Sequence, residues 1–258
     1  MPESRWFQTR GASADASARI FCFPHAGGNP RTFLDWQPQL EADAEIVAVC
    51  MPGRGGEPVP SSVAELADGA AAAIRERADV PIHLFGHSLG ALVAFEVARR
   101  LRDVDALRHV VASGCAAPSL LPSERVVHAA RLEGRELAEA VEFFGGLPRE
   151  VLDDEDLREL PLPSVQADLR LVASYRYEAA APLEVPLTLV NGREDPHVTD
   201  AALLPWRQEL RDDPARHWVD GGHFYFERDG HAVVDILRPL VLGDRGRADL
   251  ADHHMELI

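Results

Sequence analysis

The amino-acid sequence predicts an α/β fold, with a mostly parallel central sheet and helices on both of its faces. Short apolar runs rich in β-branched residues alternate along the chain with longer stretches of helical periodicity. The runs are apolar almost throughout, which is typical of parallel strands covered on both sides. The 258 residues, 46% of them hydrophobic, are enough for a sizeable core. We therefore expect residues 1–258 to form a single domain.

The predicted strands are spaced so that a helix fits between most neighbours. The strands cover 19–23, 45–50, 82–85, 107–113, 187–191 and 216–219. The helices cover about 31–41, 62–78, 89–102, 200–211 and 229–241. The helix at 89–102 is apolar nearly all round in its first turns, which is typical of a helix that lies against the centre of a sheet.

The alternation of strands and helices breaks between about 116 and 184. Helix-like patches at 123–144 and 153–177 are separated by Gly145-Gly146 and by prolines, and no convincing strand occurs there. An insertion of this length without strands is often functional, and α/β sheets bind ligands at the carboxyl ends of their strands. We therefore expect a helical lid over that edge of the sheet. Ordinary packing helices are the alternative.

The charged residues exclude several classes of function. All 26 basic residues are arginines, so no lysine is available for a Schiff base or a P-loop. The net charge of −16 disfavours binding to nucleic acid or to anionic membranes. No apolar run approaches the roughly 20 residues that cross a bilayer. The first ten residues lack the apolar core of a signal peptide, so we expect a cytoplasmic protein.

The cysteines and the terminal histidines give no sign of a metal site or a disulfide framework. The three cysteines are odd in number and widely spaced, which favours small buried side chains: Cys22, Cys50 and Cys115. The polar segment at about 243–258 is expected to be a flexible tail, and its His253-His254 pair is not interpreted as a metal site. We expect no cofactor.

The pentapeptide Gly86-His87-Ser88-Leu89-Gly90 has the pattern G-x-S-x-G and lies directly between a predicted strand and a predicted helix. In α/β-hydrolases such a serine occupies a sharp, strained turn that exposes its hydroxyl at the helix N-terminus. Backbone N–H groups there can stabilise an oxyanion. Ser88 is therefore the expected nucleophile, and a capping serine is the alternative.

A serine nucleophile needs a histidine base and an acid that orients the histidine. In this fold the acid follows the serine along the chain, and the histidine follows the acid. Asp195 comes just after the strand at 187–191, and His223 follows the next strand through a Gly-Gly pair. We expect His223 to be the base and Asp195 the acid. Glu194 is the competing acid, although Pro196 fixes the turn after Asp195.

Other polar residues near these motifs have simpler interpretations. Asp200 and Asp220 are expected to be a helix cap and a solvated loop residue. The glycine-bearing loop after the first predicted strand is where a second oxyanion donor comes from in α/β-hydrolases. We assign the two oxyanion N–H groups to the backbones of Ala26 and Leu89. His25 is expected to line the pocket rather than to act in catalysis.

Six motifs, in order along roughly residues 6–240, resemble those of type II thioesterases. They are FCFPHAGGNPRTFLDW (21–36), MPGRGGE (51–57), GHSLGA (86–91), DLRLVASYRY (168–177), NGREDPHVT (191–199) and GGHFYF (221–226). Type II thioesterases are separate α/β-hydrolases that accompany polyketide synthases and nonribosomal peptide synthetases. The resemblance implies the α/β-hydrolase fold and the hydrolysis of thioesters on the phosphopantetheine arm of acyl or peptidyl carrier proteins, which edits stalled or aberrant acyl groups.

Position by position, the resemblance assigns the nucleophile, acid and base to Ser88, Asp195 and His223, in agreement with the spacing argument. The sequence departs from common family residues at Leu89, Gln166, Ala173 and Val219-Asp220. None of these departures changes the triad. Those in the lid leave the acyl-chain preference open.

A carrier protein is the partner that the resemblance implies. Carrier proteins are typically acidic, so this negatively charged chain and its partner would repel each other. Salt screens that repulsion beyond a Debye length of roughly 8 Å. We therefore expect weak, transient docking by a monomer through local arginine patches and the pantetheine arm. The lid arginines Arg125, Arg131 and Arg135 are candidates for such a patch.

Several other functions remain open at this point. A general carboxylesterase, an acyl-CoA thioesterase, a thioesterase that terminates fatty-acyl chains and a macrocyclising enzyme would all use the same three residues. A catalytically inactive carrier-binding protein belongs to a different class. The intact set of serine, acid and histidine argues against it.

Overall fold

The computed structural model describes residues 5–11, 16–40, 43–53, 58–142, 161–228 and 230–255. Seven strands within these residues form one sheet, in the order β1-β3-β2-β4-β5-β6-β7. Their bounds are β1 Phe7–Gln8, β2 Arg19–Phe23, β3 Glu45–Val49, β4 Ile82–His87, β5 Leu107–Ser113, β6 Leu187–Gly192 and β7 Ala215–Val219. All neighbours are parallel except β1 and β3. The prediction of a mostly parallel α/β sheet is confirmed.

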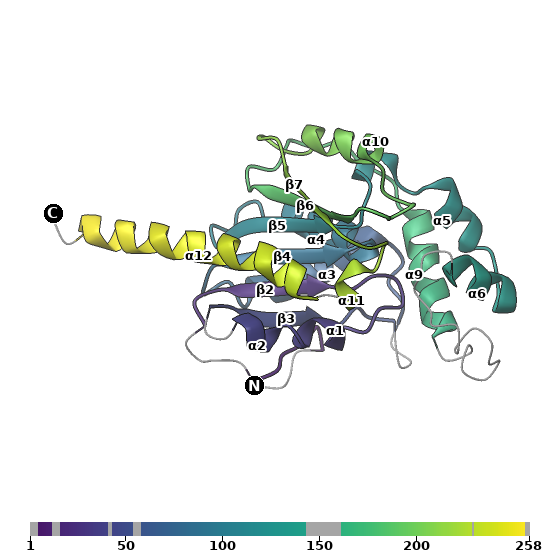
Figure 1. The fold of residues 1–258 in the computed structure, drawn as a ribbon, viewed down its shortest axis with the longest axis horizontal. Helices are drawn as coiled ribbons and strands as arrows, with labels where there is room; N and C mark the ends of the chain where they lie inside the picture. Colours follow the sequence, from purple (N-terminus) through teal and green to yellow (C-terminus); the bar gives the residue numbers. More distant parts are fainter. Residues whose placement is uncertain are drawn as a thin grey trace.

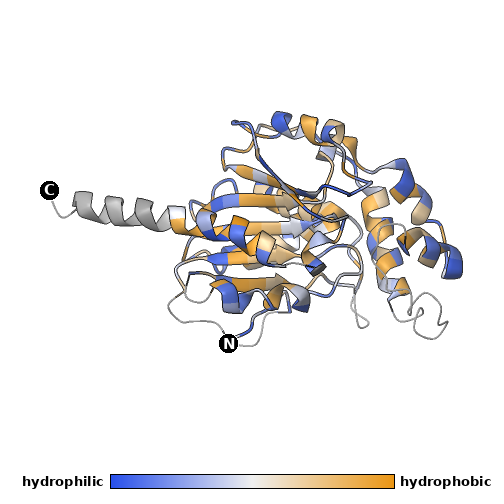
Figure 2. Cartoon of the chain, viewed as in Figure 1, coloured by the Kyte–Doolittle hydropathy of each residue, from blue (hydrophilic) through white to orange (hydrophobic). Residues whose placement is uncertain are grey.

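Alternate residues of the strands supply two separate hydrophobic layers. Phe21 and Phe23 of β2 pack into one cluster, whereas Ile20 and Cys22 of the same strand pack into the other. Successive side chains of a strand point to opposite faces, so the two clusters cover opposite faces of the sheet. The apolar strands therefore form the centre of the molecule, with hydrophobic colouring along the sheet in Figure 2.

Each face of the sheet is covered by its own helices (Figure 1). The first cluster joins the sheet to α3 (Val63–Arg75) and α4 (Leu89–Arg100). The second joins it to α1 (Arg31–Leu34), α2 (Gln37–Leu40), α11 (Tyr225–Arg228) and α12 (Gly230–Met255). Helix α4 follows the central strand β4 and is buried along almost its whole length, as the sequence predicts.

The predicted helix boundaries differ from the observed ones mainly where short helices follow one another. The predicted helix at 31–41 is divided into α1 and α2. The one at 200–211 consists of α10 (Asp200–Leu203) and a 3-10 helix, η2 (Leu204–Gln208). A proline near the start of η2 removes a backbone donor. Helix α12 continues to Met255, so most of the expected tail at about 243–258 is helical, and its flexibility stays a prediction.

Among the described residues between β5 and β6, three helices gather beside the carboxyl ends of the strands, near the label α9 in Figure 1. They are α5 (Glu124–Ala129), α6 (Gly134–Glu142) and α9 (Leu162–Ser174), preceded by a 3-10 helix, η1 (Pro118–Leu120). They share a hydrophobic cluster of their own. The expectations for 143–160, including Gly145-Gly146, lie outside the described residues. We call α5, α6 and α9 the lid helices, and their action as a lid stays a prediction.

Among the residues that the structure describes, no helix is both long enough and apolar enough to span a bilayer.

Candidate active site

Ser88 lies at the junction between the central strand β4 and helix α4, in a strained backbone conformation. Its φ of 54° and ψ of −117° make it the one non-glycine residue with positive φ in the described part of the chain. Its side chain is half-buried and lines a cavity. Such strain persists where the surrounding fold enforces it, and here the effect is to hold the serine at the surface of the cavity.

The two glycines of the G-x-S-x-G motif permit this junction because the backbone passes very close to them. A Cβ atom on Gly86 would lie 2.1 Å from the carbonyl oxygen of Gly90, and one on Gly90 would lie 2.1 Å from that of Phe23. Phe23 ends β2, next to β4 in the sheet. The motif therefore serves the close packing of strand, turn and helix that presents Ser88.

Asp195 and His223 form a hydrogen-bonded pair at the ends of β6 and β7. The distance from His223 Nδ1 to Asp195 Oδ2 is 2.7 Å, and the exposed fractions of their side chains are 5% and 0%. The other carboxylate oxygen of Asp195 accepts the backbone N–H of His197 at 2.8 Å. With both oxygens engaged, the carboxylate fixes the orientation of the imidazole ring and leaves its Nε2 for a second partner.

Backbone hydrogen bonds connect the two loops that carry this pair. The N–H of Arg193 donates to the carbonyl of Val219 at 2.8 Å, and that of Glu194 donates to the carbonyl of Gly221 at 2.9 Å. Burial, the largest single influence, opposes ionisation of the Asp195 carboxyl, but its hydrogen bonds and charge interactions with His223 and His197 together outweigh burial, so its pKa is lowered. Asp195 is therefore an anion beside the histidine at neutral pH.

The competing acidic residues lie in other surroundings. Glu194 is exposed. Asp220 is solvated, with its side chain 90% exposed and in contact with Arg193 at 3.0 Å. Asp200 begins α10, but the capping side chain is that of Thr199, whose oxygen accepts the Ala202 N–H, so the expectation that Asp200 is the cap is corrected by one residue.

The loop after β2 forms a turn beside the cavity. The N–H of Gly28 donates to the carbonyl of His25 at 2.8 Å. Ala26 lies in this turn, and both Ala26 and Leu89 line the cavity with Ser88. Leu89 is the first residue of α4, where backbone N–H groups are without partners in the helix. His25 lines the same cavity, with its ring 4.7 Å from that of Phe224, as expected for a pocket residue.

A buried network that the sequence did not reveal lies next to Ser88 and involves the preceding residue, His87. His87 Nδ1 and Ser113 Oγ are 2.7 Å apart, and Ser113 Oγ and Tyr225 Oη are 2.6 Å apart. Burial, and then the neighbouring His223 and His25, hold the pKa of His87 well below its ordinary value, so its ring is neutral. The ring centroids of His87 and His223 are 4.7 Å apart. His87 is therefore an uncharged neighbour of His223.

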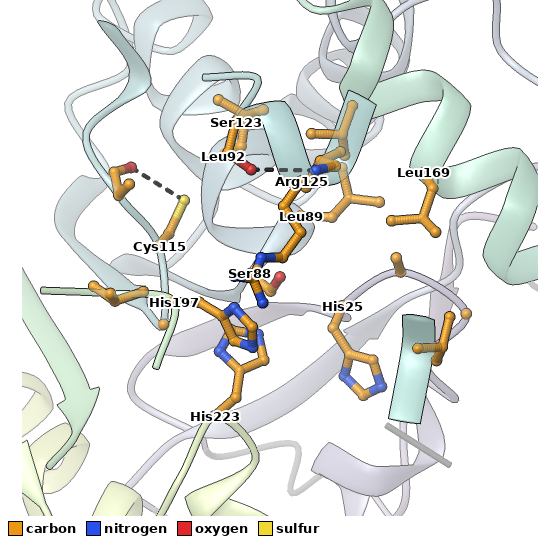
Figure 3. Close-up of a pocket in the computed structure, with 18 of the residues that line it drawn as sticks. His25, Ser88, Leu89, Leu92, Cys115, Ser123, Arg125, Leu169, His197 and His223 are labelled. Carbon is orange, nitrogen blue, oxygen red and sulfur yellow. Dashed lines mark hydrogen bonds between the residues drawn. The ribbon is translucent and has the colours of Figure 1, made fainter. Parts of the chain in front are cut away.

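The cavity in front of Ser88 has a volume of about 340 Å³ and lies between the sheet edge and the lid helices. Figure 3 shows Ser88, His223 and His25 around it, with Leu169 of α9 on its far side. Most of the remaining lining is apolar, including Leu92, Val141, Val165, Leu169 and Val172. A cavity of this size and character suits a short apolar group held next to the serine.

The cysteines and arginines singled out in the sequence take different positions. Cys22 and Cys115 are buried, and burial raises the pKa of the Cys115 thiol to about 12, so both behave as small apolar side chains. Cys50, which was also expected to be buried, is only half-buried, because it lies just after the end of β3. Arg125 of α5 lines the cavity, and it points inward in Figure 3. Arg135 contacts Glu139 at 2.8 Å on α6. The arginine patch proposed for carrier docking stays a prediction.

Comparisons with known proteins give a family model, a relative and two solved structures that are similar to this chain over most of its length. The family model described as the thioesterase domain matches residues 18–240. A relative named linear gramicidin dehydrogenase LgrE, from Brevibacillus parabrevis, is 31% identical over 94% of this chain and 96% of its own length. The solved type II thioesterase BorB, from the borrelidin biosynthetic cluster, is 29% identical, with a TM-score of 0.82 over 93% of this chain and 99% of its own. YbtT, a type II thioesterase from the yersiniabactin NRPS/PKS pathway, is 28% identical, with a TM-score of 0.76 over 93% and 97%.

Proposed function

The chain belongs to the thioesterase family, and we propose that it is a type II thioesterase that removes acyl groups from carrier proteins of a polyketide or nonribosomal peptide synthase. One observation carries the proposal. Ser88 opens onto the same cavity as His223, whose ring is hydrogen-bonded to a buried carboxylate. BorB and YbtT are described as type II thioesterases of biosynthetic pathways, which supports the choice of a polyketide or nonribosomal peptide pathway.

In the first step of the proposed reaction, Ser88 Oγ attacks the thioester carbonyl carbon while His223 Nε2 takes the hydroxyl proton. Asp195 holds the ring and stabilises the imidazolium that forms. The carbonyl oxygen becomes an oxyanion, and in this mechanism two backbone N–H groups stabilise it: that of Ala26 in the loop after β2 and that of Leu89 at the N-terminus of α4. The carbon–sulfur bond then breaks, and the proton on His223 passes to the departing thiol.

In the second step, water hydrolyses the acyl-serine. His223 removes a proton from the water as its oxygen attacks the ester carbon, and it then returns that proton to Ser88 Oγ as the ester bond breaks. The acid is released and the serine is regenerated. The apolar lining of the cavity would hold the acyl chain in both steps, while the pantetheine arm reaches the serine from outside.

The nature of the partner follows from charge and chemistry. A net charge of −16 on this chain opposes long-range attraction to an acidic carrier protein. We propose a monomer that works in the cytoplasm and associates weakly and transiently, chiefly through the pantetheine arm. Its affinity for the carrier should therefore change little with salt concentration.

The name of LgrE raises a redox alternative. A dehydrogenase transfers hydride to or from a nicotinamide, whereas a nucleophilic serine with an acid–histidine pair is suited to acyl transfer. The same chemistry would also serve an acyl-CoA thioesterase, a general esterase or a chain-terminating enzyme. Comparing the substrates directly separates these functions.

The test is the release of acyl groups from a loaded acyl carrier protein by the purified chain. Wild type should hydrolyse acyl-carrier thioesters with a higher kcat/KM than acyl-CoA or nitrophenyl esters, without consuming NADPH. Ser88→Ala should abolish the release. Ser174→Ala, which changes a lid serine outside the cavity lining, should not. Full activity in Ser88→Ala would refute the assignment, and a preference for acyl-CoA would shift it to the alternative substrate class.

A further inference from the structure

A carboxylate of lid helix α9 is hydrogen-bonded to the loop that carries one of the proposed oxyanion donors. Asp168 Oδ2 accepts the backbone N–H of Gly27 at 2.7 Å. Asp168 is only 8% exposed, and the other buried residues of α9 are all apolar. A buried carboxylate is costly unless hydrogen-bond donors satisfy it, so this contact is a specific feature of the fold.

Helical spacing explains why Asp168 can reach the loop. Val165, Leu169 and Val172 line the cavity and are separated by four and three residues, so they form one face of α9. Asp168 is three residues after Val165 and lies on that same face. Val165 also contacts the loop, because a Cβ atom on Gly27 would lie 2.3 Å from Val165 Cγ2. Two successive turns of α9 therefore hold Gly27.

The loop itself has two possible forms. The hydrogen bond from Gly28 N–H to the His25 carbonyl closes a four-residue turn. Gly27, its third residue, has a φ of +71°, and Ala26 is not among the residues with positive φ, so the turn is of type II. Rotation of the Ala26–Gly27 peptide would convert it to type I, which requires negative φ at Gly27. The rotation exchanges the directions of the peptide N–H and carbonyl.

The two forms differ in how they meet Asp168. In the observed form the Gly27 N–H points at the carboxylate. In the rotated form the Ala26 carbonyl would take its place, and two acceptor oxygens would repel each other. Asp168 therefore selects the type II turn both by attraction and by repulsion.

We propose that Asp168 is a positioning residue through which lid helix α9 sets the oxyanion loop and makes catalysis depend on the position of the lid. This inference rests on the proposed function, in which Ala26 N–H is an oxyanion donor. Displacement of α9 from the loop removes the acceptor of Gly27 N–H, and the turn can then rotate. The dipole of the Ala26–Gly27 peptide beside the reaction centre then reverses, and the turn that holds the Ala26 N–H in place loses its fixed form.

The proposal is tested with Asp168→Ala, Asp168→Asn and a matched control on the same helix. Gln166→Ala serves as the control because Gln166 Nε2 donates to the Leu132 carbonyl within the lid, away from the oxyanion loop. Each variant is first compared with wild type by thermal unfolding. Steady-state kinetics on an acyl-pantetheine thioester then separates kcat from KM.

Asp168→Ala should lower kcat about tenfold to hundredfold with little change in KM, somewhat less than the loss of a whole oxyanion donor. An alkylboronic acid forms a tetrahedral adduct with the serine, and its affinity should fall by a similar factor. Amide hydrogen exchange in residues 24–30 should become faster. Asp168→Asn retains an acceptor oxygen and should recover most of the activity, while Gln166→Ala should stay within about threefold of wild type.

Three results would overturn the inference: an unchanged kcat in Asp168→Ala, a loss seen only in KM, or an equal loss in Gln166→Ala. A variant that fails to fold is replaced by Gly27→Ala, whose Cβ disfavours the positive φ and should produce the same kcat and boronate pattern. Unchanged boronate affinity in a folded Gly27→Ala also counts against the proposal. Ser88→Ala is measured in parallel. Full hydrolytic activity in that variant contradicts the proposed function itself, whereas an inactive Ser88→Ala beside a fully active Asp168→Ala contradicts only the role of the lid.

Discussion

Replacing Asp195 by asparagine removes one negative charge and keeps the shape of the side chain. In the structure its Oδ2 accepts from His223 Nδ1 at 2.7 Å and its Oδ1 accepts the His197 N–H at 2.8 Å. An asparagine that keeps the second bond presents its NH₂ group to His223. Because NH₂ is a donor, the imidazole must then carry its proton on Nε2, and it can no longer accept the proton of Ser88.

The size of the effect follows from charge and burial. A carboxylate and an imidazolium about 4 Å apart attract each other by about 4 kcal/mol at an effective dielectric constant of about 20. The side chain of Asp195 is 0% exposed, so water does not replace this attraction. A loss of that size slows the reaction about 10³-fold, and the wrong tautomer increases the loss toward the roughly 10⁴-fold seen when the acid of another serine triad is amidated.

The assay is single-turnover acylation of the enzyme by an acyl-pantetheine thioester, followed over the pH range 5–9. We expect Asp195→Asn to acylate at least about 10³-fold more slowly. Glu194→Gln is the matched control, because it amidates the adjacent, exposed carboxylate. If Glu194→Gln were the impaired variant and Asp195→Asn nearly normal, the identity of the acid would be wrong. A loss of less than tenfold in both would refute the electrostatic reasoning.

Three further predictions concern the pH dependence of stability, the close packing at Gly90 and the acyl-chain preference. The pKa of Asp195 is lowered from 3.8 in the folded state, so ionisation of its carboxyl stabilises the fold above pH 3.8, and this contribution is lost as the pH falls through the folded pKa. The amount by which the Tm of wild type exceeds that of Asp195→Asn should therefore decrease from pH 6 to pH 3. Gly90→Ala places a methyl group 2.1 Å from the Phe23 carbonyl and should lower the unfolding free energy by about 2 kcal/mol or more, measured by urea denaturation. Arg125→Leu makes the cavity lining more apolar and should raise the octanoyl-to-acetyl ratio of kcat/KM about threefold or more, measured with an acyl-pantetheine series; an unchanged ratio would mean that Arg125 does not contact the acyl chain.

The strands of the parallel sheet could be predicted because each is a short apolar run that needs no distant information. Residues 19–23 and 107–113 were predicted with the observed bounds. The edge strand β1 was missed, since two residues give no periodicity. The division of 31–41 into two helices was also missed, because it depends on how the segment packs beneath the sheet.

The chemistry of the site could be predicted for a similar reason. Ser88, Asp195 and His223 each come directly after a predicted strand, and parallel strands bring their carboxyl ends to one edge. Local sequence therefore selects these residues as candidates without any knowledge of the distances between them. It could not reveal the contact between His87 and Ser113 or the one between Asp168 and Gly27, whose partners are 26 and 141 residues apart.

The sequence by itself therefore determined the order of the strands along the chain and the class of reaction, and it predicts Ser88 as the nucleophile, because apolar periodicity and short motifs are local properties. Only the tertiary structure decided which acidic residue meets the histidine, where the cavity lies and what holds the oxyanion loop. Those features depend on side chains that approach each other across separate elements. Glu194 and Asp195 are adjacent in the chain, but only Asp195 is turned inward to His223.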